Sequence, residues 1–559
     1  MSLFSELRRR NVLKVALLYA VASLLIVWIV DHAVSGELLP IWGKEFMLLL
    51  LAIGFPVALI FAWVYEITPE GLRKGVDVDQ TQSIVYKTGQ KLNAAVAVLG
   101  VLGVAALIGE RLLPEFEFVR PESVEEIPLR PSYDSPLGEG VPKEITAYTM
   151  SNGLRIVVWP DYDIPNVVMY NFVRAGGRNE YPGITGLSHF FEHMMFSAAT
   201  AELGPGEFDR IMENAGGANN AFTSNDLTVY QNWFPRSALE TILELEADRL
   251  QNLDIDPDVV ESERGVVYSE RRLRVDNDNN GRLYEQMMAT AFVAHPYQLP
   301  VIGWPSDIEN WTQDDLEAYY RTYYAPNNCT MVFSGAVSPE EIFLLAEQYF
   351  APIPRHNPPP PVRTVEPEQA GERRLVIETQ AETPLLHVAF HGGRAADPET
   401  QQMNLLLNIL VGGDSSRLHR ILVEEEQLAL SVGGLQMEGF DPGLVYFFLT
   451  LPPGADVAAV EARLLEELAR VAARGVTAAE LSKAQNNMIA DFWRRLATID
   501  GKARSLGEFD VFTGTYENLF ALPEQVSAIT SKDLRTIAGR VFDANRMTVG
   551  VLRSPGDES

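Results

Sequence analysis

The chain has 559 residues, a formal net charge of −30 and a single cysteine, Cys329. This length exceeds what one hydrophobic core supports, so we expect two or more domains. The negative charge argues against nucleic acid as a partner, and one cysteine excludes an intramolecular disulfide framework. We interpret the acidic excess as a solvated surface and Cys329, within an apolar run, as a core residue.

Residues 1–112 are predicted to be an all-α membrane anchor with about three transmembrane helices. Apolar runs occupy residues 15–30, 46–64 and 93–108. The second run is long enough to cross about 30 Å of hydrocarbon, whereas the first and third are marginal. A cleaved signal peptide is the alternative for the first run, but no small-residue cleavage site follows it.

The basic residues around these runs predict their orientation. Arg8, Arg9, Arg10 and Lys14 precede the first run, Lys44 follows it, and Arg73, Lys74, Lys87 and Lys91 separate the second run from the third. Basic segments stay in the cytoplasm, so the chain from about residue 115 onward is expected on the other side. Residues 4–12 and 68–72 are similar to a membrane region of various bacterial proteins, which implies a bacterial inner membrane and a periplasmic globular part.

An acidic linker with several prolines covers residues 113–143, and a first globular domain covers residues 144–351. Apolar, valine-rich segments predict strands, and apolar residues at helical spacing predict helices. The expected strands are 153–159, 167–173, 228–234 and 330–334, and the expected helices are 185–197, 207–215, 237–253 and 314–324.

The helix expected at 185–197 contains His189-Phe190-Phe191-Glu192-His193. Positions i and i+4 share one face of a helix, so His189 and His193 can point at the same metal ion. Glu192 would lie close enough to polarise a metal-bound water. This inverted His-x-x-Glu-His order is typical of zinc peptidases, in which three protein ligands leave one position open for water.

A third ligand is available in the segment 256–274. Asp256-Pro257 is typical of a helix start. Glu263 and Glu270 lie seven residues apart, two turns along one face. Glu270 would complete a site of two histidines and one glutamate, and Glu263 could orient a ligand histidine. Alternatively, these glutamates belong to a solvated face that also carries arginines.

A proline-rich linker, residues 352–373, contains four consecutive prolines and favours a polyproline II spacer. A second domain, residues 374–555, repeats the order of strand, helix and strand. Strands are expected at 385–390 and 445–451, and helices at 403–410, 457–473 and 478–494. No second His-x-x-Glu-His occurs there, and we interpret His387, His391 and His419 as ordinary core or surface histidines.

The motif, followed by Glu-x6-Glu ending at Glu270, resembles the pitrilysin/insulinase family of zinc peptidases. Further similar segments occur in family order from about residue 145 to about 550. They are Ala175–Glu180, Gly216–Thr223, His295-Pro296-Tyr297, Tyr324–Asn328, and Ser415-Ser416-Arg417-Leu418 after Gly412-Gly413. The resemblance implies an α+β fold of two homologous α/β-sandwich domains, a half-shell whose second domain is catalytically silent.

The resemblance also implies roles for individual residues. His189, His193 and Glu270 would bind Zn²⁺, Glu192 would be the general base, and Glu263 would support the ligands. The substrate-binding residues would be Asn220, Ala221, Phe222 and Thr223, on an exposed edge strand that pairs with an extended peptide. For Asn220 a turn position after Gly216-Gly217 is the alternative.

The expected function is therefore that of a membrane-anchored zinc endopeptidase, which hydrolyses peptides or unfolded polypeptides by Glu-assisted attack of zinc-bound water. Short family members resemble half-shells that pair, so a homodimer or an inactive sister subunit is expected as partner. The missing half usually contributes an Arg and a Tyr, which cannot be located in this sequence. The alternatives are a non-catalytic structural subunit and a peptide-binding subunit of a peptidase-like complex.

Overall fold

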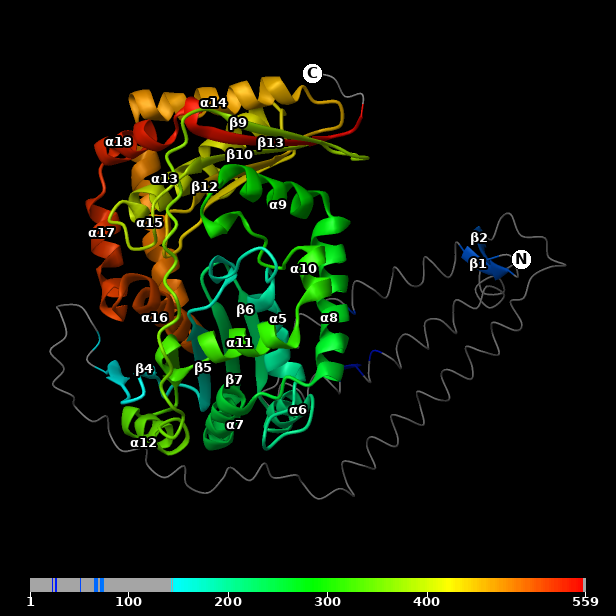
Figure 1. Cartoon of the computed structure of the whole chain (residues 1–559). Helices are drawn as coiled ribbons and strands as arrows, with labels where there is room; N and C mark the ends of the chain where they lie inside the picture. The colour runs from blue at the N-terminus through cyan, green and yellow to red at the C-terminus, as the bar shows by residue number, and fades with distance from the viewer. Residues whose placement is uncertain are drawn as a thin grey trace, which may run out of the picture. The chain divides into compact units, whose positions relative to one another are not determined.

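The computed structural model describes residues 144–555, Pro142, and a small part of the N-terminal region: Ser23, Ile26, Val27, Leu51, Tyr65–Thr68 and Gly71–Lys74. The chain divides into two units, Met1–Arg130 and Pro131–Ser559. Figure 1 gives the element labels.

In the first unit, β1 (Tyr65–Thr68) and β2 (Gly71–Lys74) form an antiparallel hairpin. The prediction of an all-α region is therefore wrong for this segment, which contains two short strands. The three expected transmembrane runs lie outside the described residues, apart from four isolated positions. Among the described residues, no helix combines the length and the apolar character that crossing a membrane requires.

The second unit contains two sheets. The first sheet has six strands in the order β3-β4-β8-β5-β7-β6. Its strands are β3 (Thr146–Thr149), β4 (Arg155–Pro160), β5 (Asn166–Val173), β6 (Ala218–Thr223), β7 (Thr228–Pro235) and β8 (Cys329–Gly335). β4 and β8 are parallel, and the other pairs are antiparallel. β8 is central and completely buried, and Cys329 at its start is a core residue, as predicted.

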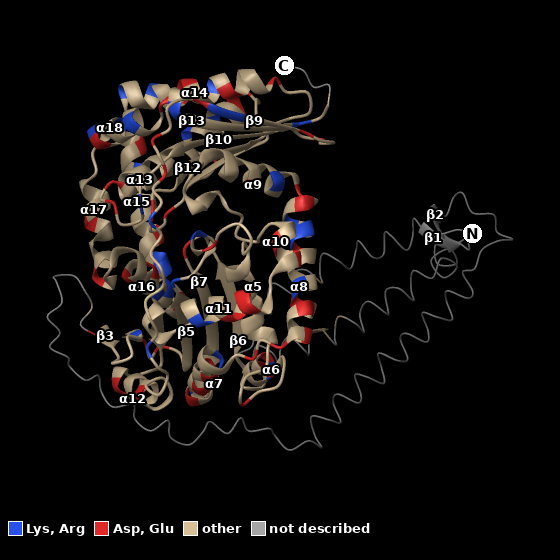
Figure 2. Cartoon of the chain, in the orientation of Figure 1, with Lys and Arg blue, Asp and Glu red and all other residues tan. Residues whose placement is uncertain are grey.

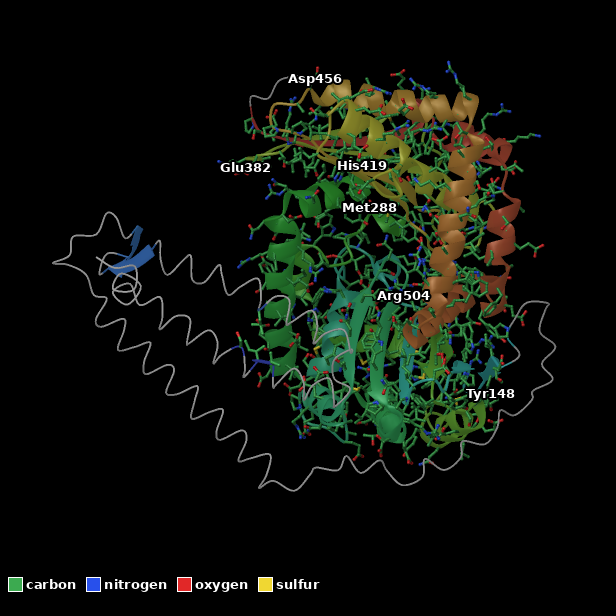
Figure 3. All side chains as sticks on the ribbon, turned by 180° about the vertical axis from the view of Figure 1, so that it is seen from behind. Tyr148, Met288, Glu382, His419, Asp456 and Arg504 are labelled. Atoms are coloured by element: carbon green, nitrogen blue, oxygen red, sulfur yellow. The ribbon has the colours of Figure 1, made fainter. Side chains whose placement is uncertain are left out.

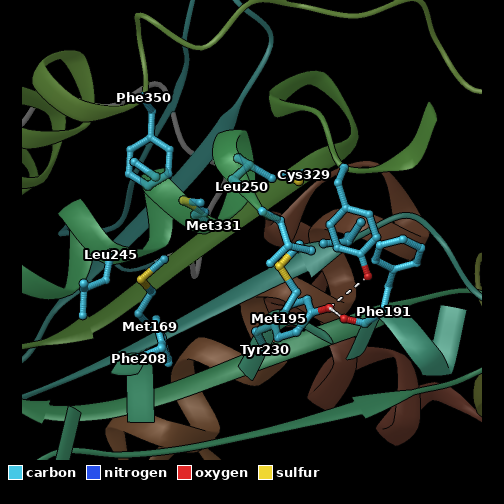
Figure 4. Close-up of a cluster of buried hydrophobic side chains, with 14 of the residues drawn as sticks. Met169, Phe191, Met195, Phe208, Tyr230, Leu245, Leu250, Cys329, Met331 and Phe350 are labelled. Carbon is cyan, nitrogen blue, oxygen red and sulfur yellow. Dashed lines mark hydrogen bonds between the residues drawn. The ribbon is translucent and has the colours of Figure 1, made fainter. Parts of the chain in front are cut away.

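Helices cover one face of this first sheet. They are α5 (Leu187–Ser197), α6 (Glu207–Asn214), α7 (Leu239–Asn252), α8 (Pro257–Arg271), α10 (Pro305–Asn310), α11 (Gln313–Tyr323) and α12 (Pro339–Tyr349). Their apolar faces share one core with the sheet. Figure 4 shows part of this core, in which the Tyr230 hydroxyl of β7 donates a 3.2 Å hydrogen bond to the carbonyl of Phe191 on α5.

The second sheet has five strands in the order β11-β12-β10-β13-β9. Its strands are β9 (Arg373–Glu378), β10 (Leu385–His391), β11 (Ser431–Gln436), β12 (Leu444–Thr450) and β13 (Met547–Arg553). The helices of this half are α13 (Thr400–Val411), α14 (Val457–Arg474), α15 (Ala478–Leu496), α16 (Ile499–Thr513), α17 (Leu522–Ala528) and α18 (Ser531–Val541). The two-domain α+β fold predicted from the sequence is confirmed.

The two halves exchange a helix. α9 (Asn279–Ala291), from the first half of the chain, packs its apolar side against the second sheet. In Figures 1 and 3 it lies on the side of that sheet opposite α14, with Met288 labelled in Figure 3. In return, α16 packs against β5 and β8 of the first sheet. α9 precedes the linker and packs on the second sheet, and α16 follows the linker and packs on the first sheet.

Polar contacts strengthen the docking of α16 on the first sheet. Arg155 of β4 forms a bidentate pair with Asp510, with N–O distances of 2.9 and 3.1 Å. Asp500 accepts hydrogen bonds from Tyr170 and Trp233 at 2.8 and 2.7 Å. Asp510 is almost fully buried, so its pair with Arg155 is shielded from solvent more than a surface ion pair would be.

The linker between the halves contains no helix or strand from residue 352 to 372, and it is anchored at several points. The Glu366 carboxylate accepts hydrogen bonds from the backbone N–H groups of Val293, Ala294 and His295 at 3.0–3.1 Å. Gln369 donates to the carbonyl of Met547 at 2.7 Å. The linker is therefore bonded to both halves. Its prolines alone indicate only a spacer.

Acidic and basic residues alternate along the outer helices, most clearly along α8 and α14 in Figure 2. On α14, for example, Arg470 pairs with Glu466 one turn before it, and both side chains are exposed. This alternation of sign is the pattern of a solvated helical face.

Candidate metal centre

The His-x-x-Glu-His motif lies on α5, one of the helices that cover the first sheet. Phe190 and Phe191 are completely buried in the core, which turns the histidines away from it. Glu180 caps the helix, since its carboxylate accepts the N–H groups of Gly186 and Ser188 at 2.7 Å each. Burial raises the pKa of Glu180 to about 8. The start of α5 is thus held by a buried side chain.

The helix α8 supplies the two glutamates. Asp256 caps it by accepting hydrogen bonds from the N–H groups of Asp258 and Val259, and Pro257 is its first residue, as predicted. Val260 and Val267 bury one side of α8 in the core. This packing sets α8 beside α5.

The structure brings the three predicted ligands together. Glu270 Oε2 lies 3.3 Å from Nε2 of His189 and 3.3 Å from Nε2 of His193. One donor atom from each residue lies within 4.8 Å of the others, and no other such group occurs within the described part of the chain. The three side chains are 12–22% exposed, so the site is accessible but mostly enclosed. The alternative of a solvated glutamate face does not hold for Glu270.

The histidines and glutamates of this cluster shift one another's pKa values. Burial lowers the pKa of His193, but Glu263 and Glu270 outweigh it and raise the pKa to about 9. Hydrogen bonds from His189 and His193 hold the pKa of Glu270 well below its usual range. The carboxylates of Glu263 and Glu270 therefore make the surroundings of His193 negative, which favours a positive charge there.

Two further side chains orient the ligands. Glu263 Oε2 lies 3.4 Å from Nδ1 of His193, the ring nitrogen that faces away from Glu270. Arg274, on the π-helical turn η3 (Arg272–Asp276), contacts Glu270 Oε1 at 2.7 Å and leaves Oε2 to the histidines. Sequence reasoning missed Arg274, although its i+4 spacing from Glu270 is a signal for such a pair.

The donor set fits a zinc ion. Two imidazole nitrogens and one carboxylate oxygen are a ligand set of catalytic zinc sites, and they leave coordination positions for water or substrate. A carboxylate on the second nitrogen of a ligand histidine, as Glu263 provides for His193, is the usual outer support of such sites. These residues would therefore hold zinc without rearrangement of the helices.

The predicted base and the predicted substrate strand lie side by side. Thr223, the last residue of β6, donates a 2.5 Å hydrogen bond to Oε2 of Glu192. β6 pairs only with β7, so it is an edge strand of the first sheet. Asn220 is exposed and opposite Gln231 within this strand, and the turn alternative for Asn220 is therefore wrong.

A cavity of about 670 Å³ shares Arg274, the partner of Glu270, with the surroundings of the cluster. Arg274 lines it on one side and Asn225, from the turn after β6, on another. Most of the remaining wall is apolar and includes Leu273, Tyr284 and Met288. Sequence reasoning did not find this cavity, because the turn after β6 is distant in the chain from η3 and α9.

Known protein families and a known relative match the globular part of this chain. A family described as "Insulinase (Peptidase family M16)" matches residues 166–304, and one described as "Peptidase M16 inactive domain" matches residues 310–488. The zinc protease PqqE of Helicobacter pylori is 31% identical over 412 residues, which cover 72% of this chain and 92% of that protein. The chain belongs to the insulinase family of peptidases. The family predicted from the motifs is thereby confirmed.

Other proteins match a similar share of this chain. The uncharacterized zinc protease YmxG of Bacillus subtilis is 25% identical, over 71% of this chain and 96% of that protein. A crystal structure of a protease from Helicobacter pylori matches with a TM-score of 0.71 and 28% identity, over 74% of this chain and 99% of that one. The Escherichia coli periplasmic protease PqqL matches in fold, with a TM-score of 0.62 and 18% identity, and this chain covers 48% of it.

The match to the inactive domain begins within the first half, at residue 310, and extends through much of the second half to residue 488. The three histidines interpreted there as ordinary residues belong to no candidate metal group among the described residues. His387, for example, is buried, contacts the Tyr446 hydroxyl at 2.8 Å, and has a pKa lowered to about 4 by burial. The metal cluster lies entirely in the part matched by the insulinase description.

Proposed function

We propose that this protein is a zinc-dependent endopeptidase that hydrolyses peptides or unfolded polypeptides. The observation that carries the proposal is the convergence of His189, His193 and Glu270, with Glu192 on the same helical turn as the histidines. Relatives named zinc proteases support zinc as the ion. His189, His193 and Glu270 would hold it, and Glu263 and Arg274 would orient these ligands.

The chemistry divides between the ion and the chain. Zinc, when bound, supplies a Lewis acid that acidifies water and polarises a carbonyl group. Glu192 takes the proton of the attacking water on its carboxylate and returns it to the leaving nitrogen. Thr223 holds that carboxylate in place. The strand β6 positions the substrate by pairing with its backbone, which makes recognition largely independent of sequence.

The cavity beside the cluster supports a preference for one class of side chain. Its wall is formed by Leu273, Tyr284 and Met288 among others, and it adjoins Glu270 through Arg274. We propose that it accepts a large apolar side chain of the substrate next to the bond that is cut. Binding of such a side chain removes apolar surface from water on both partners.

The N-terminal region and the partner complete the proposal. The apolar runs of residues 1–112 support anchoring in a bacterial inner membrane, and the basic residues beside them support a periplasmic globular unit. Alkaline phosphatase fused after residue 140 should therefore be active; activity of a cytoplasmic reporter alone at this junction would contradict it. A second half-shell, from a second copy or an inactive sister chain, is expected to close the chamber, and sedimentation of a fully active monomer would contradict that expectation.

The central experiment separates catalysis from binding. Purified protein is analysed for zinc and tested on a fluorogenic peptide library, beside the variant Glu192→Gln. We expect about one zinc per chain in both proteins and cleavage by the parent only. Zinc without cleavage in the parent would favour the alternative of a peptide-binding subunit, and full activity of Glu192→Gln would remove the assignment of the base.

A further inference from the structure

We propose that Thr223 is a positioning residue, which aligns the carboxylate of Glu192 and couples this alignment to the strand that binds the substrate. The inference rests on the proposed peptidase function and deepens it. Thr223 was predicted from the sequence only as part of the substrate strand. Its hydroxyl also contacts the predicted base, Glu192.

The contact between the two side chains is direct. Oγ1 of Thr223 lies 2.5 Å from Oε2 of Glu192. A hydroxyl that donates to a carboxylate makes a short, charge-assisted hydrogen bond. Within the described residues, no other group forms a hydrogen bond with the Glu192 carboxylate. A glutamate has three rotatable side-chain bonds, so this one contact selects the orientation of the base.

The position of Thr223 is itself fixed by the turn that follows it. The N–H of Ser224 donates to the Leu227 carbonyl at 2.8 Å, and the Ser224 hydroxyl accepts the N–H groups of Asp226 and Leu227 at 3.2 and 3.0 Å. Thr223 faces Thr228 in the last pair of the β6–β7 ladder. Thr223 therefore lies at the end of a β-hairpin whose turn is held by its own hydrogen bonds.

A second segment supports this hairpin end from outside. The N–H groups of Gly177 and Arg178 donate to the carbonyls of Ser224 and Asn225 at 3.2 and 2.8 Å. Gly176 passes so close that a Cβ there would lie 2.5 Å from the Ser224 carbonyl oxygen. The segment Ala175–Arg178, which belongs to one of the family-like motifs, thus packs against the turn that follows Thr223 and forms hydrogen bonds with it.

This arrangement links substrate binding to base alignment. A peptide that pairs with the free edge of β6 adds hydrogen bonds along Asn220–Thr223 and reduces the motion of that strand. Because the same strand ends at Thr223, the strand that receives the substrate also holds Glu192. A misplacement of about 1 Å in a reacting group can cost about 100-fold in rate, so loss of the hydroxyl should affect turnover more than binding.

The test compares Thr223→Val, which keeps the shape without the hydroxyl, with Thr223→Ser, which keeps the hydroxyl. Thr536→Val, at an exposed position of α18 far from the motif in sequence, is the matched control, and the hydroxyl that it removes donates to the Lys532 carbonyl. The full chain in detergent is assayed for kcat and KM on a fluorogenic peptide, for zinc content, and for binding of that peptide to the zinc-free protein. For Thr223→Val we expect kcat to fall about 10–100-fold, with zinc content unchanged and KM and peptide affinity changed less than about twofold. Thr223→Ser should recover kcat to within about threefold of the parent.

Each other outcome overturns the inference. An unchanged kcat in Thr223→Val would mean that the hydroxyl does not align the base, and equal losses of zinc and activity would mean that it holds the metal helix. If Thr223→Val does not fold, Thr223→Ala replaces it with the same expectations. A parent that binds zinc but cleaves no peptide would overturn the proposed function and this inference with it, a result distinct from failure of the variants alone.

Discussion

Three glutamates on the single helix α8 allow a graded test of the metal site. Glu270 contacts both histidines, Glu263 contacts only Nδ1 of His193, and Glu261 is 78% exposed and pairs with Arg264. We expect zinc affinity to fall most in Glu270→Ala, less in Glu263→Ala, and not measurably in Glu261→Ala. All three changes remove the same atoms from the same helix, so differences in helix propensity cancel.

The magnitudes follow from these contacts. Four-ligand zinc sites bind with about 10–16 kcal/mol, or roughly 3–4 kcal/mol for each ligand. Removal of Glu270 should therefore weaken binding by about 100–1,000-fold. Glu263 acts through the ring of His193, and loss of such a partner typically costs about 10–100-fold. Arg274 would lose its contact with Glu270 in the first variant, but it is 71% exposed and can remain solvated.

The affinities are measured by competition for zinc against a chromophoric chelator at constant pH, with circular dichroism as a check of folding. The assay does not depend on peptidase activity. Equal losses in Glu263→Ala and Glu270→Ala would refute the distinction between ligand and support. A loss in Glu261→Ala as large as in Glu263→Ala would indicate a general electrostatic effect of the helix in place of specific contacts.

Three further predictions address packing, pH and specificity. Gly507→Ala on α16 would put a Cβ 2.0 Å from the ring of Phe172, so overpacking should lower the free energy of unfolding by about 1–2 kcal/mol in urea titrations. Gly539→Ala on α18, where nothing lies within 4 Å, should raise it by about 0.5–1 kcal/mol. Burial raises the pKa of Asp226 from 3.8 to about 6, so its contribution to stability is complete below pH 4 and is lost as the pH rises to 6. The difference corresponds to about 3 kcal/mol, and Asp226→Asn should remove this part of the pH dependence; equal effects at pH 4 and pH 8 would contradict it. Tyr284→Ala should shift cleavage in the peptide library about 10-fold toward bulkier apolar side chains, and an unchanged preference would argue against the cavity as a subsite.

The Asp226 prediction concerns the junction between the two halves. Asp226 accepts hydrogen bonds from the Tyr297 hydroxyl at 2.8 and 2.9 Å, and Arg178 lies 3.5 Å away. Arg178 also contacts Asp441 of the second half at 2.5 Å, and His295 lies 3.1 Å from the same carboxylate. Loss of stability at this junction as the pH rises should therefore be seen as weaker docking of the halves, which hydrogen exchange can localise.

Local pattern predicted many of the elements well. The strand expected at 167–173 is Asn166–Val173, and the metal helix expected at 185–197 is Leu187–Ser197. Sequence reasoning missed α16, in which Gly501 and Gly507 weaken the helical signal. Gly507 is buried against Phe172, where its lack of a side chain allows the helix to approach the sheet. Packing of this kind outweighs the low helix propensity of glycine.

The sequence by itself determined the features that depend on short-range geometry. The i, i+4 spacing sets His189 and His193 on one face of a helix, and the Asp-Pro start defines where α8 begins. Tertiary structure alone decided that Glu270 meets both histidines, that Thr223 holds Glu192, and that the halves exchange α9 and α16. Backbone periodicity is a local property that neighbouring residues encode, whereas the meeting of distant segments depends on the summed packing of many weak contacts across the whole core.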